Sequence, residues 1–514
     1  MSKSEQRREK TYTLIFFAVL AVGIFVRVWR FGAVPGGLNQ DEAFAGYEAW
    51  SLLNCGTDSA GYRFPVYLTA WGSGMNALNS YLMIPFIAMF GLEVWVIRLP
   101  QLIVACLTLP AVYGVVRRLS GRPTALTAMF LLAICPWHIM LARWGLESNL
   151  APGFLVFGLY FFLRALEDES FLMLSAAMYG VSLYCYATVW PFVPLIILLQ
   201  CVHAIRTKRL KFSACAIVSL LILALFALPL LLFLAVNYGL IAELRLPFLS
   251  VPRLLYMRSG EISFSHFFEN LGNAMKMFLT QSDGLPWNCA GIFGQLYPFS
   301  VIFELIGLGF CISRYVKALR ENTFSGEAFI LIQLFAALLL TALIDVNINR
   351  ANIIFIPRVM LAACGIICVS RLSVKAVFPA VCVIYALFFL FFTSYYFGEY
   401  STQISFYFGG GTGEAVSAAL DTPGKIYVSD DIYYPVVLFY SETPTDEFRA
   451  SVEYRSYPAA YLKAKSFGRF EFISTDGEIL RDGVYILSQY DDRTPFTEAG
   501  FIVEEYGYAA LATP

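Results

Sequence analysis

Charged side chains are scarce in this sequence. Lys, Arg, Asp and Glu together make up 14% of the 514 residues, whereas ordinary soluble domains carry about 25%. Hydrophobic residues make up 58% of the chain and recur in long runs. These proportions exclude a soluble globular protein, and the formal net charge of -1 gives no indication of a nucleic-acid partner. The composition therefore predicts a polytopic α-helical membrane protein.

Patterns that bind metals or nucleotides are also missing. The three histidines are scattered, and most of the 11 cysteines lie inside apolar segments without paired metal spacing. The glycine-rich run at 409–413 lacks the Lys-Ser/Thr ending of a phosphate loop, so we expect a flexible joint there. A nucleotide-dependent enzyme is therefore not indicated, and the sequence predicts no resident metal.

The membrane topology follows from the length of the apolar runs and from the cytoplasmic preference of Lys and Arg. Basic residues before the first run place the N-terminus in the cytoplasm. The count predicts about 11 transmembrane helices, a first outer loop at 30–95 and a second large outer loop at 237–295. The expected helices lie near residues 12–29, 96–116, 123–141, 150–164, 171–188, 190–205, 212–235, 297–313, 327–344, 353–370 and 376–397.

A small domain of different composition follows the membrane region, which comprises residues 1–397. Residues 398–514 have the composition of a soluble domain, and an odd number of crossings places them outside. Strands are expected at 425–429, 436–440, 470–474 and 484–488, and a helix over 450–465. The sequence therefore predicts an extracytoplasmic α/β domain at the C-terminus.

Two adjacent carboxylates, Asp41 and Glu42, follow the first expected span. One interpretation is structural: Asn39 or Gln40 caps a helix to about Leu53, and the acids in its first turn are stabilised by the helix dipole. The same charge counting places two further polar clusters on this face of the membrane: Arg143 with Glu147, and Asn347 with Arg350. Three polar clusters on one side predict a functional site there.

An outer-face site has no cytoplasmic supply of nucleotides. A group-transfer enzyme there needs an activated donor that arrives through the bilayer, for instance on a polyprenyl phosphate. Such a site needs a carboxylate that takes a proton from the acceptor and a cation that holds the departing lipid phosphate.

The quoted residues carry a resemblance to a known family. Asp41-Glu42 after the first span, the run from Arg143 to Glu147 after the third, and Arg350 through Pro357 before a late span resemble the GT-C superfamily of membrane glycosyltransferases. The chain is most similar to the family 39-like branch, related to protein O-mannosyltransferases and lipid A aminoarabinose transferases. The resemblance implies a bacterial plasma-membrane enzyme. It would move a sugar from a polyprenyl-phosphate donor to an envelope polysaccharide, glycolipid or protein, in one inverting step.

The resemblance also implies roles for the acidic residues and for one arginine. Asp41 would be the general base, and Glu42 would orient the site or the acceptor. Arg143 would pair with these carboxylates, and Glu147 would be the second acid near this arginine; an ion pair between Arg143 and Glu147 on one helix is the alternative. A divalent cation at Asp41 and Glu42 is compatible with this chemistry but not required by it.

Three arginines are candidates for binding the donor phosphate. Arg350 is expected at the outer membrane edge, where guanidinium would hold phosphate bidentately. Arg358 would reach the same group or extend toward the interface. Arg63 would replace a lysine of the aminoarabinose transferases, whose Lys-Pro-Pro element is absent here.

The remaining candidates are expected to contact the substrate: Tyr47, Trp71 and Asn347. Tyr47 and Trp71, like Trp287, would either stack on a sugar or anchor the chain at the interface. Two other classes of protein stay open, a transporter or flippase of lipid-linked sugars and a non-catalytic scaffold. A transporter would carry polar residues near the membrane midplane and repeat-like symmetry between its halves, and neither is evident.

Overall fold

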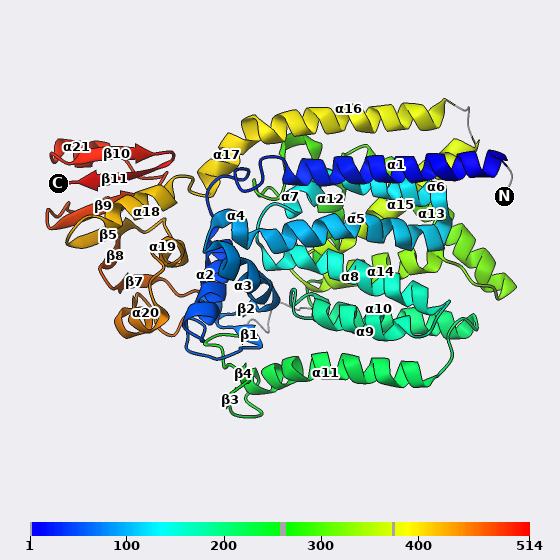
Figure 1. Ribbon diagram of the computed structural model, residues 1–514, viewed down its shortest axis with the longest axis horizontal. Helices are drawn as coiled ribbons and strands as arrows, with labels where there is room; N and C mark the ends of the chain where they lie inside the picture. The colour runs from blue at the N-terminus through cyan, green and yellow to red at the C-terminus, as the bar shows by residue number, and fades with distance from the viewer. Residues whose placement is uncertain (1–2, 258–263, 373–375) are drawn as a thin grey trace.

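The structure, a computed structural model, describes residues 3–257, 264–372 and 376–514. Long helices that run mostly side by side form a bundle, and a sheet with short helices packs at one end of it (Figure 1). The N-terminus lies at the opposite end of the bundle (Figure 1). The expected fold class, a polytopic helical membrane protein with a C-terminal α/β domain, is confirmed.

The helices of the bundle follow the expected spans. They are α1 (Lys3–Val28), α4 (Val94–Ile97), α5 (Leu99–Ser120), α6 (Arg122–Ile134), α7 (Pro136–Leu141), α8 (Ala151–Ala165), α9 (Phe171–Ser182), α10 (Val189–Arg206), α11 (Ala214–Asn237), α13 (Ser300–Glu321), α14 (Glu327–Leu343), α15 (Phe355–Leu372) and α16 (Val377–Phe397). Seven helical stretches, those that contain α1, α5, α8, α10, α11, α15 and α16, are long and apolar enough to cross a membrane. The helices α6, α9 and α14 are apolar but shorter.

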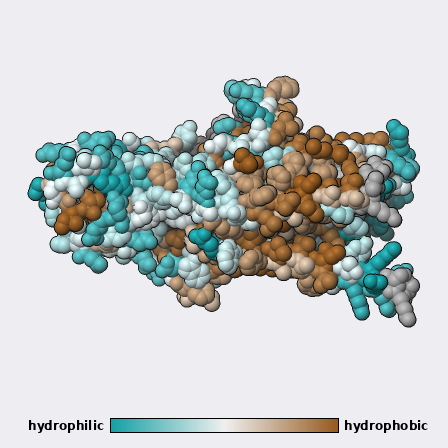
Figure 2. All heavy atoms as spheres, turned by 90° about the horizontal axis from the view of Figure 1, so that it is seen from above, coloured by the Kyte–Doolittle hydropathy of each residue, from teal (hydrophilic) through white to brown (hydrophobic). Residues whose placement is uncertain are grey.

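The surface of the bundle differs in hydropathy from that of the C-terminal domain. Hydrophobic side chains dominate the surface of the bundle, whereas the C-terminal domain and the far end of the bundle are mainly hydrophilic (Figure 2). Leu220, Leu225 and Leu228 on α11 and Leu390 and Phe391 on α16 are among the exposed apolar residues. An exposed apolar surface of this extent suits contact with lipid.

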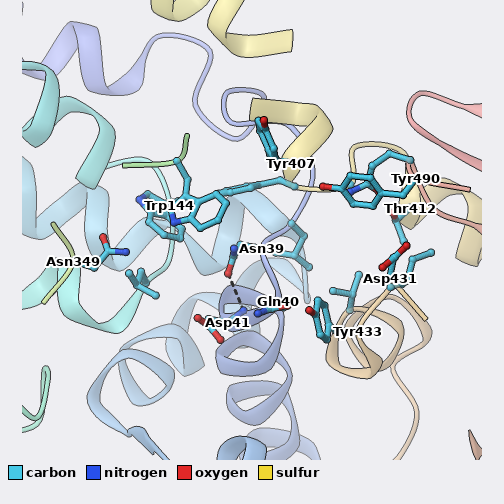
Figure 3. Close-up of a pocket in the computed structure, with 18 residues that line it drawn as sticks. Asn39, Gln40, Asp41, Trp144, Asn349, Tyr407, Thr412, Asp431, Tyr433 and Tyr490 are labelled. Carbon is cyan, nitrogen blue, oxygen red and sulfur yellow. Dashed lines mark hydrogen bonds between the residues drawn. The ribbon is translucent and has the colours of Figure 1, made fainter. Parts of the chain in front are cut away.

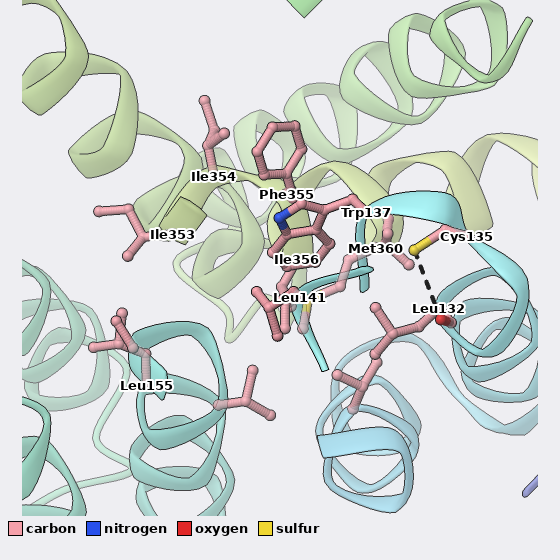
Figure 4. Packing of buried hydrophobic residues seen from close by; sticks show 14 of the residues in the cluster. Leu132, Cys135, Trp137, Leu141, Leu155, Ile353, Ile354, Phe355, Ile356 and Met360 are labelled. Carbon is pink, nitrogen blue, oxygen red and sulfur yellow. Dashed lines mark hydrogen bonds between the residues drawn. The ribbon is translucent and has the colours of Figure 1, made fainter. Parts of the chain in front are cut away.

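The interior of the bundle is packed around Trp137 (Figure 4). Its ring lies 4.9 Å from that of Phe355, centroid to centroid, and its indole N–H donates to Asn352 Oδ1 at 2.9 Å. The buried indole therefore has its one polar atom satisfied, and it joins α7 to the start of α15.

The C-terminal domain contains a seven-stranded mixed sheet in the order β10-β11-β9-β5-β8-β7-β6. Only the central β5 pairs in parallel, with β8 and β9. The strands are β5 (Lys425–Ser429), β6 (Glu453–Tyr454), β7 (Ala464–Phe467), β8 (Phe470–Ile473), β9 (Gly483–Leu487), β10 (Ile502–Tyr506) and β11 (Ala509–Thr513). The helices are α17 (Glu399–Tyr407), α18 (Thr412–Leu420), α19 (Tyr434–Ser441), α20 (Thr445–Ser451) and α21 (Thr494–Glu498).

Two expectations for this domain were wrong. The strand expected at 436–440 is part of helix α19, because Pro435 favours a helix start and a short apolar run fits a buried helix as well as a strand. The helix expected over 450–465 ends at Ser451, and the chain continues through the short strand β6. Pro458 in this stretch lacks the N–H that a helix interior needs.

The first loop lies between the bundle and the C-terminal domain. It contains α2 (Gln40–Asn54), β1 (Tyr67–Leu68), β2 (Met75–Asn76) and α3 (Leu78–Phe90). The second loop contributes β3 (Leu244–Leu246), β4 (Leu249–Val251) and α12 (Phe267–Thr280), and its residues 258–263 lie outside the described residues. Helix α2 packs on α3 and on α19, and one apolar cluster includes Phe44 and Phe439. The first loop and the C-terminal domain therefore share one end of the bundle.

Helices α13 and α15 touch through two glycines. A Cβ at Gly307 would lie 1.9 Å from the carbonyl oxygen of Leu361, and one at Gly365 would lie 2.0 Å from that of Phe303. Small residues allow helices in membranes to approach this closely.

We expect Gly307→Leu to separate α13 from α15 and to lower the thermal unfolding temperature of the purified protein clearly. Overpacking of this kind costs about 1–3 kcal/mol or more. Gly309→Leu is the matched control, because a Cβ at Gly309 on the same helix meets nothing within 4 Å. Equal melting temperatures for the two variants would contradict the close contact.

Two buried carboxyl groups tie the end of α2 to the segment that follows it. Glu48 and Asp58 are each 1% exposed. Glu48 accepts hydrogen bonds from the backbone N–H, at 2.8 Å, and the hydroxyl of Ser59, and Asp58 accepts one from the N–H of Tyr62 at 2.7 Å. Burial, followed by repulsion from Asp58, raises the pKa of Glu48 to about 8, and burial raises the pKa of Asp58 to about 6.

These raised pKa values predict a stability that depends on pH. A group whose pKa is higher in the folded state contributes stability below its unfolded pKa, and this stability is lost as the pH rises through its folded pKa. We therefore expect the melting temperature to fall by a few degrees between about pH 5 and pH 8.5. In Glu48→Gln the fall should be clearly smaller, as differential scanning fluorimetry across this range would show. An unchanged pH dependence in this variant would contradict the assignment.

Candidate functional site

The start of α2 positions the acidic pair. Asn39 caps the helix, since its side chain accepts the N–H of Asp41 at 2.9 Å and its own N–H donates to Glu42 Oε2 at 3.2 Å. The half-buried Asp41 accepts a hydrogen bond from the indole of Trp71, Nε1 to Oδ1, at 3.1 Å. The ring of Trp71 stacks on Tyr461, with centroids 4.6 Å apart. The orientation of the Asp41 carboxylate is therefore set by a packed indole.

Glu42 forms a buried ion pair with Arg98. The distances are 2.8 Å from Nε to Oε1 and 2.9 Å from Nη2 to Oε2, and both side chains are 0% exposed. Arg98 also donates to the carbonyls of Pro35 at 2.7 Å and Gly37 at 3.0 Å, and Glu42 accepts the N–H of Gly145. The pair thus joins four segments of the chain and holds the helix turn that carries Asp41.

The sequence analysis did not identify Arg98. The second span was expected from residue 96, so it already contained this arginine near its start. A charged residue inside an expected span is itself a signal of a buried partner or a functional site. That signal was present and would have pointed to an acid in the first outer loop.

Arg143 does not pair with the acidic residues, so this expectation was wrong. Its buried guanidinium donates to the backbone carbonyls of Val26, Arg27, Arg30 and Val34, at 2.7–3.2 Å. The last carbonyls of a helix lack intrahelical partners and carry partial negative charge. Arg143 therefore secures the end of α1 and the turn after it. The alternative of an ion pair on one helix also falls away, because a turn separates Arg143 from the short 3-10 helix Glu147–Leu150.

A cavity of about 350 Å³ opens beside Asp41 (Figure 3). We call it the Asp41 cavity. The membrane region and the C-terminal domain both contribute to its wall. Its lining comprises Leu38, Asn39, Gln40, Asp41, Trp144, Leu146, Trp287, Asn349, Tyr407, Phe408, Gly409, Thr412, Asp431, Ile432, Tyr433, Val436, Gln489 and Tyr490.

A second cavity, of about 160 Å³, contains Arg350 and Glu147. We call it the Arg350 cavity. Its wall also includes Tyr67, Ser73, Gly74, Asn76, Tyr186, Ala187, Thr188, Trp190, Phe233, Leu254, Met257 and Ile344. At two points of the chain, consecutive residues line different cavities. Leu146 lines the Asp41 cavity and Glu147 the Arg350 cavity, and Asn349 and Arg350 are divided in the same way. The two cavities are therefore back to back across a shared wall.

Arg350 is held by its own loop. Its Nη1 donates to the carbonyl of Asp345 at 2.9 Å, and its N–H donates to Asn347 Oδ1 at 2.9 Å. Asn347 lines neither cavity, and its side chain accepts the N–H of Arg350, so its contact with substrate stays a prediction. Asn349 faces the Asp41 cavity instead.

The other two arginines expected at the donor phosphate lie elsewhere. Arg358 is buried inside the bundle, where its Nε is 2.7 Å from Glu304 Oε2 and its Nη2 donates to the carbonyl of Phe278 at 2.9 Å. An arginine with a buried acidic partner stays in the bundle. Arg63 is exposed and lines neither cavity. Of these three arginines, only Arg350 lines a cavity.

The two aromatic residues expected to contact substrate make structural contacts, and their contact with a substrate stays a prediction. Tyr47 is fully buried, and its hydroxyl donates to the carbonyl of Thr443 at 2.7 Å, which joins α2 to the C-terminal domain. Trp71 is buried against Tyr461 and reaches Asp41, and it lines neither cavity. Trp287, in contrast, lines the Asp41 cavity.

A divalent cation at the acidic pair, compatible with the chemistry but not required by it, stays untested. Among the residues that the structure describes, no group of three or more His, Cys, Asp or Glu is placed to hold a metal ion. Both oxygens of Glu42 face Arg98, so a cation at Asp41 would have to be bound without Glu42.

Comparison with known proteins shows a family match over part of the chain and the fold of the whole. Residues 77–232 match the sequence model of the family described as dolichyl-phosphate-mannose-protein mannosyltransferase. The fold is similar to crystal structures of ArnT from Cupriavidus metallidurans, at 13% identity over 98% of each chain. The TM-score is 0.57 for ArnT bound to undecaprenyl phosphate and 0.55 for apo ArnT. The chain has the fold of the GT-C membrane glycosyltransferases, and the resemblance seen in the sequence is confirmed.

A second group of solved structures shows the same fold. The oligosaccharyltransferase AglB from Archaeoglobus fulgidus, in complex with an inhibitory peptide and a dolichol-phosphate, aligns with a TM-score of 0.52 at 13% identity. The alignment covers 84% of this chain and 64% of AglB. No curated protein sequence matches the chain.

We expect Arg98→Gln to lower the free energy of unfolding by about 3–5 kcal/mol, because the variant leaves Glu42 charged and unpaired in the interior. Arg63→Gln is the matched control and should change stability by less than about 0.5 kcal/mol, since Arg63 is exposed. Thermal or denaturant unfolding in detergent would measure both. If Arg98→Gln unfolds like the control, the ion pair does not hold the site.

Proposed function

We propose that this chain transfers a sugar from a polyprenyl-phosphate donor to a cell-envelope acceptor, with Asp41 as the general base. The observation that carries the proposal is the shared wall between the Asp41 cavity and the Arg350 cavity. A carboxylate and a guanidinium then line neighbouring cavities, and the proposal requires that the donor and the acceptor meet where these cavities adjoin. The acceptor would be an envelope polysaccharide, glycolipid or protein.

The chemistry needs one base and one anion site. Asp41 takes the proton from an acceptor hydroxyl while that oxygen attacks the anomeric carbon of the sugar, and the bond from this carbon to the lipid phosphate breaks. The configuration inverts in this single step. The departing phosphate gains negative charge, which Arg350 in the neighbouring cavity stabilises. A positioned base of this kind contributes about 10² to 10⁴ in rate.

The orientation proposed for the protein follows the basic residues. Arg117 and Arg118 lie in the last turn of α5, Arg206 in that of α10 and Arg320 in that of α13. These helix ends point away from the C-terminal domain (Figure 1). With the basic end in the cytoplasm, both cavities and the C-terminal domain face the outside of a bacterial plasma membrane.

Transport of lipid-linked sugars is the alternative function. A transporter holds its substrate near the membrane midplane, between helices that move against one another. The two cavities are instead built largely from loops and the C-terminal domain, at one end of the bundle. This placement favours transfer over transport.

We expect Asp41→Asn to lower sugar transfer by at least about 100-fold while the protein folds and binds the lipid donor normally. The measurement is the consumption of radiolabelled polyprenyl-phosphate sugars by purified protein. Asp345→Asn, an exposed carboxylate in the loop that carries Arg350, is the control and should keep its activity. If both Asp41 forms move a donor across liposomes equally and neither consumes it, the protein is a transporter.

A further inference from the structure

The Asp41 cavity differs from the Arg350 cavity in charge, because the Arg350 cavity is lined by one guanidinium, Arg350, and one carboxylate, Glu147. The lining of the Asp41 cavity includes two carboxylates, Asp41 from α2 and Asp431 from the C-terminal domain, and the lining residues include no Lys, Arg or His. Lys463 interacts electrostatically with Asp431, but its ammonium, 5.8 Å from the ring centre of Tyr433, belongs to a residue outside the lining. Like charges across a binding site select strongly against a partner. The cavity therefore disfavours phosphate, carboxylate and sulfate groups.

The rest of the lining suits a carbohydrate. Trp287 and Tyr407 lie with ring centroids 6.4 Å apart, and the rings of Trp144, Tyr433 and Tyr490 complete the wall (Figure 3). Aromatic rings offer an apolar body with a polar tip, which matches the apolar face and the hydroxyl edge of a sugar ring. The amide-bearing residues of the lining are Asn39, Gln40, Asn349 and Gln489. Amides donate and accept, as a hydroxyl group requires of its partners.

Asp431 lines the Asp41 cavity from the C-terminal domain, whereas Asp41 lines it from α2. Asp431 follows β5, and its carboxylate faces the cavity near Thr412 and Tyr433 (Figure 3). Asp431 is exposed, and partial desolvation, followed by the neighbouring Asp491 and Asp430, raises the pKa of Asp431 above its ordinary value, whereas Lys463 acts in the other direction. A carboxylate accepts strong hydrogen bonds from hydroxyl donors. Two carboxylates, one from α2 and one from the C-terminal domain, would accept hydrogen bonds from the hydroxyl groups of the sugar.

We propose that the Asp41 cavity binds the uncharged sugar end of a glycan acceptor, and that Asp431 holds its hydroxyl groups and excludes phosphorylated acceptors. The proposal rests on the glycosyltransferase function above and specifies the acceptor. A volume of about 350 Å³ lies at the lower end of ligand cavities and fits the end of a glycan. The two cavities would then bind different substrates because of their charges: the anionic head of the donor binds beside Arg350, and the neutral acceptor binds beside Asp41.

The test is a binding measurement that does not depend on transfer. Full-length protein in detergent is titrated with neutral tetrasaccharides of mannose, galactose, glucose and N-acetylglucosamine. Phosphorylated mannotetraose and the cationic glucosamine tetramer complete the set, and tryptophan fluorescence with calorimetry reports binding. We expect at least one neutral tetrasaccharide to bind saturably, and the phosphorylated one to bind at least 10-fold more weakly than its neutral form.

Variants at Asp431 assign the effect to this residue. Asp431→Asn should weaken binding of the neutral ligand at least 10-fold, and Asp431→Arg should remove the discrimination against the phosphorylated one. Asp421→Asn, an exposed carboxylate at the end of α18 in the same domain, is the control and should behave as wild type. If Asp431→Arg does not fold, the test depends on Asp431→Asn alone. If Asp431→Asn leaves both the binding of the neutral ligand and the discrimination against the phosphorylated ligand unchanged, the proposed role of Asp431 is wrong.

The two proposals fail in different ways. If donor consumption depends on Asp41 but the phosphorylated or the cationic glycan binds best, or no neutral glycan binds, the inference about the acceptor is wrong and the glycosyltransferase function stands. If a neutral glycan binds in an Asp431-dependent manner but no donor is consumed, the carbohydrate site stands and the proposed transfer does not.

Discussion

The ion pair between Glu42 and Arg98 is the constraint on which the site depends. Both groups are fully buried, so neither can lose its partner without leaving a charge in the interior. Their hydrogen bonds reach Pro35, Gly37 and Gly145, and therefore the pair links the segment before α2, the start of α2, the start of α5 and the segment before Glu147. Asp41, the residue before Glu42, is placed by this assembly and then oriented by Trp71.

The C-terminal domain completes the site. Helix α19 packs on α2, and the loops of the domain supply Asp431, Tyr433 and Tyr490 to the Asp41 cavity. The Arg350 cavity is formed without this domain, from the first and second loops and the ends of the bundle helices. A division of this kind separates a lipid-phosphate side from an acceptor side. Under the proposed function it would also give the domain a role in choosing the acceptor, which the sequence left open.

Charge counting along the sequence predicted that Asp41, Glu147 and Arg350 share one face of the membrane. In the structure these three residues line the two cavities. Charge counting could not predict the partners of the charged residues. The partners of Arg143 are backbone carbonyls, which carry no residue-specific signal, and the partner of Arg358 is Glu304, an acid inside another helix. The fold class followed from composition and apolar runs, but α19 did not, because a short buried apolar run has the same pattern in a strand and in a helix.

The most direct test of the account is a cryo-electron microscopy structure of the protein with bound polyprenyl phosphate. The account predicts that the phosphate lies in the Arg350 cavity, within hydrogen-bonding distance of the Arg350 guanidinium, while the Asp41 cavity stays free for the acceptor. A phosphate found in the Asp41 cavity, between Asp41 and Asp431, would contradict the division of the two substrates by charge.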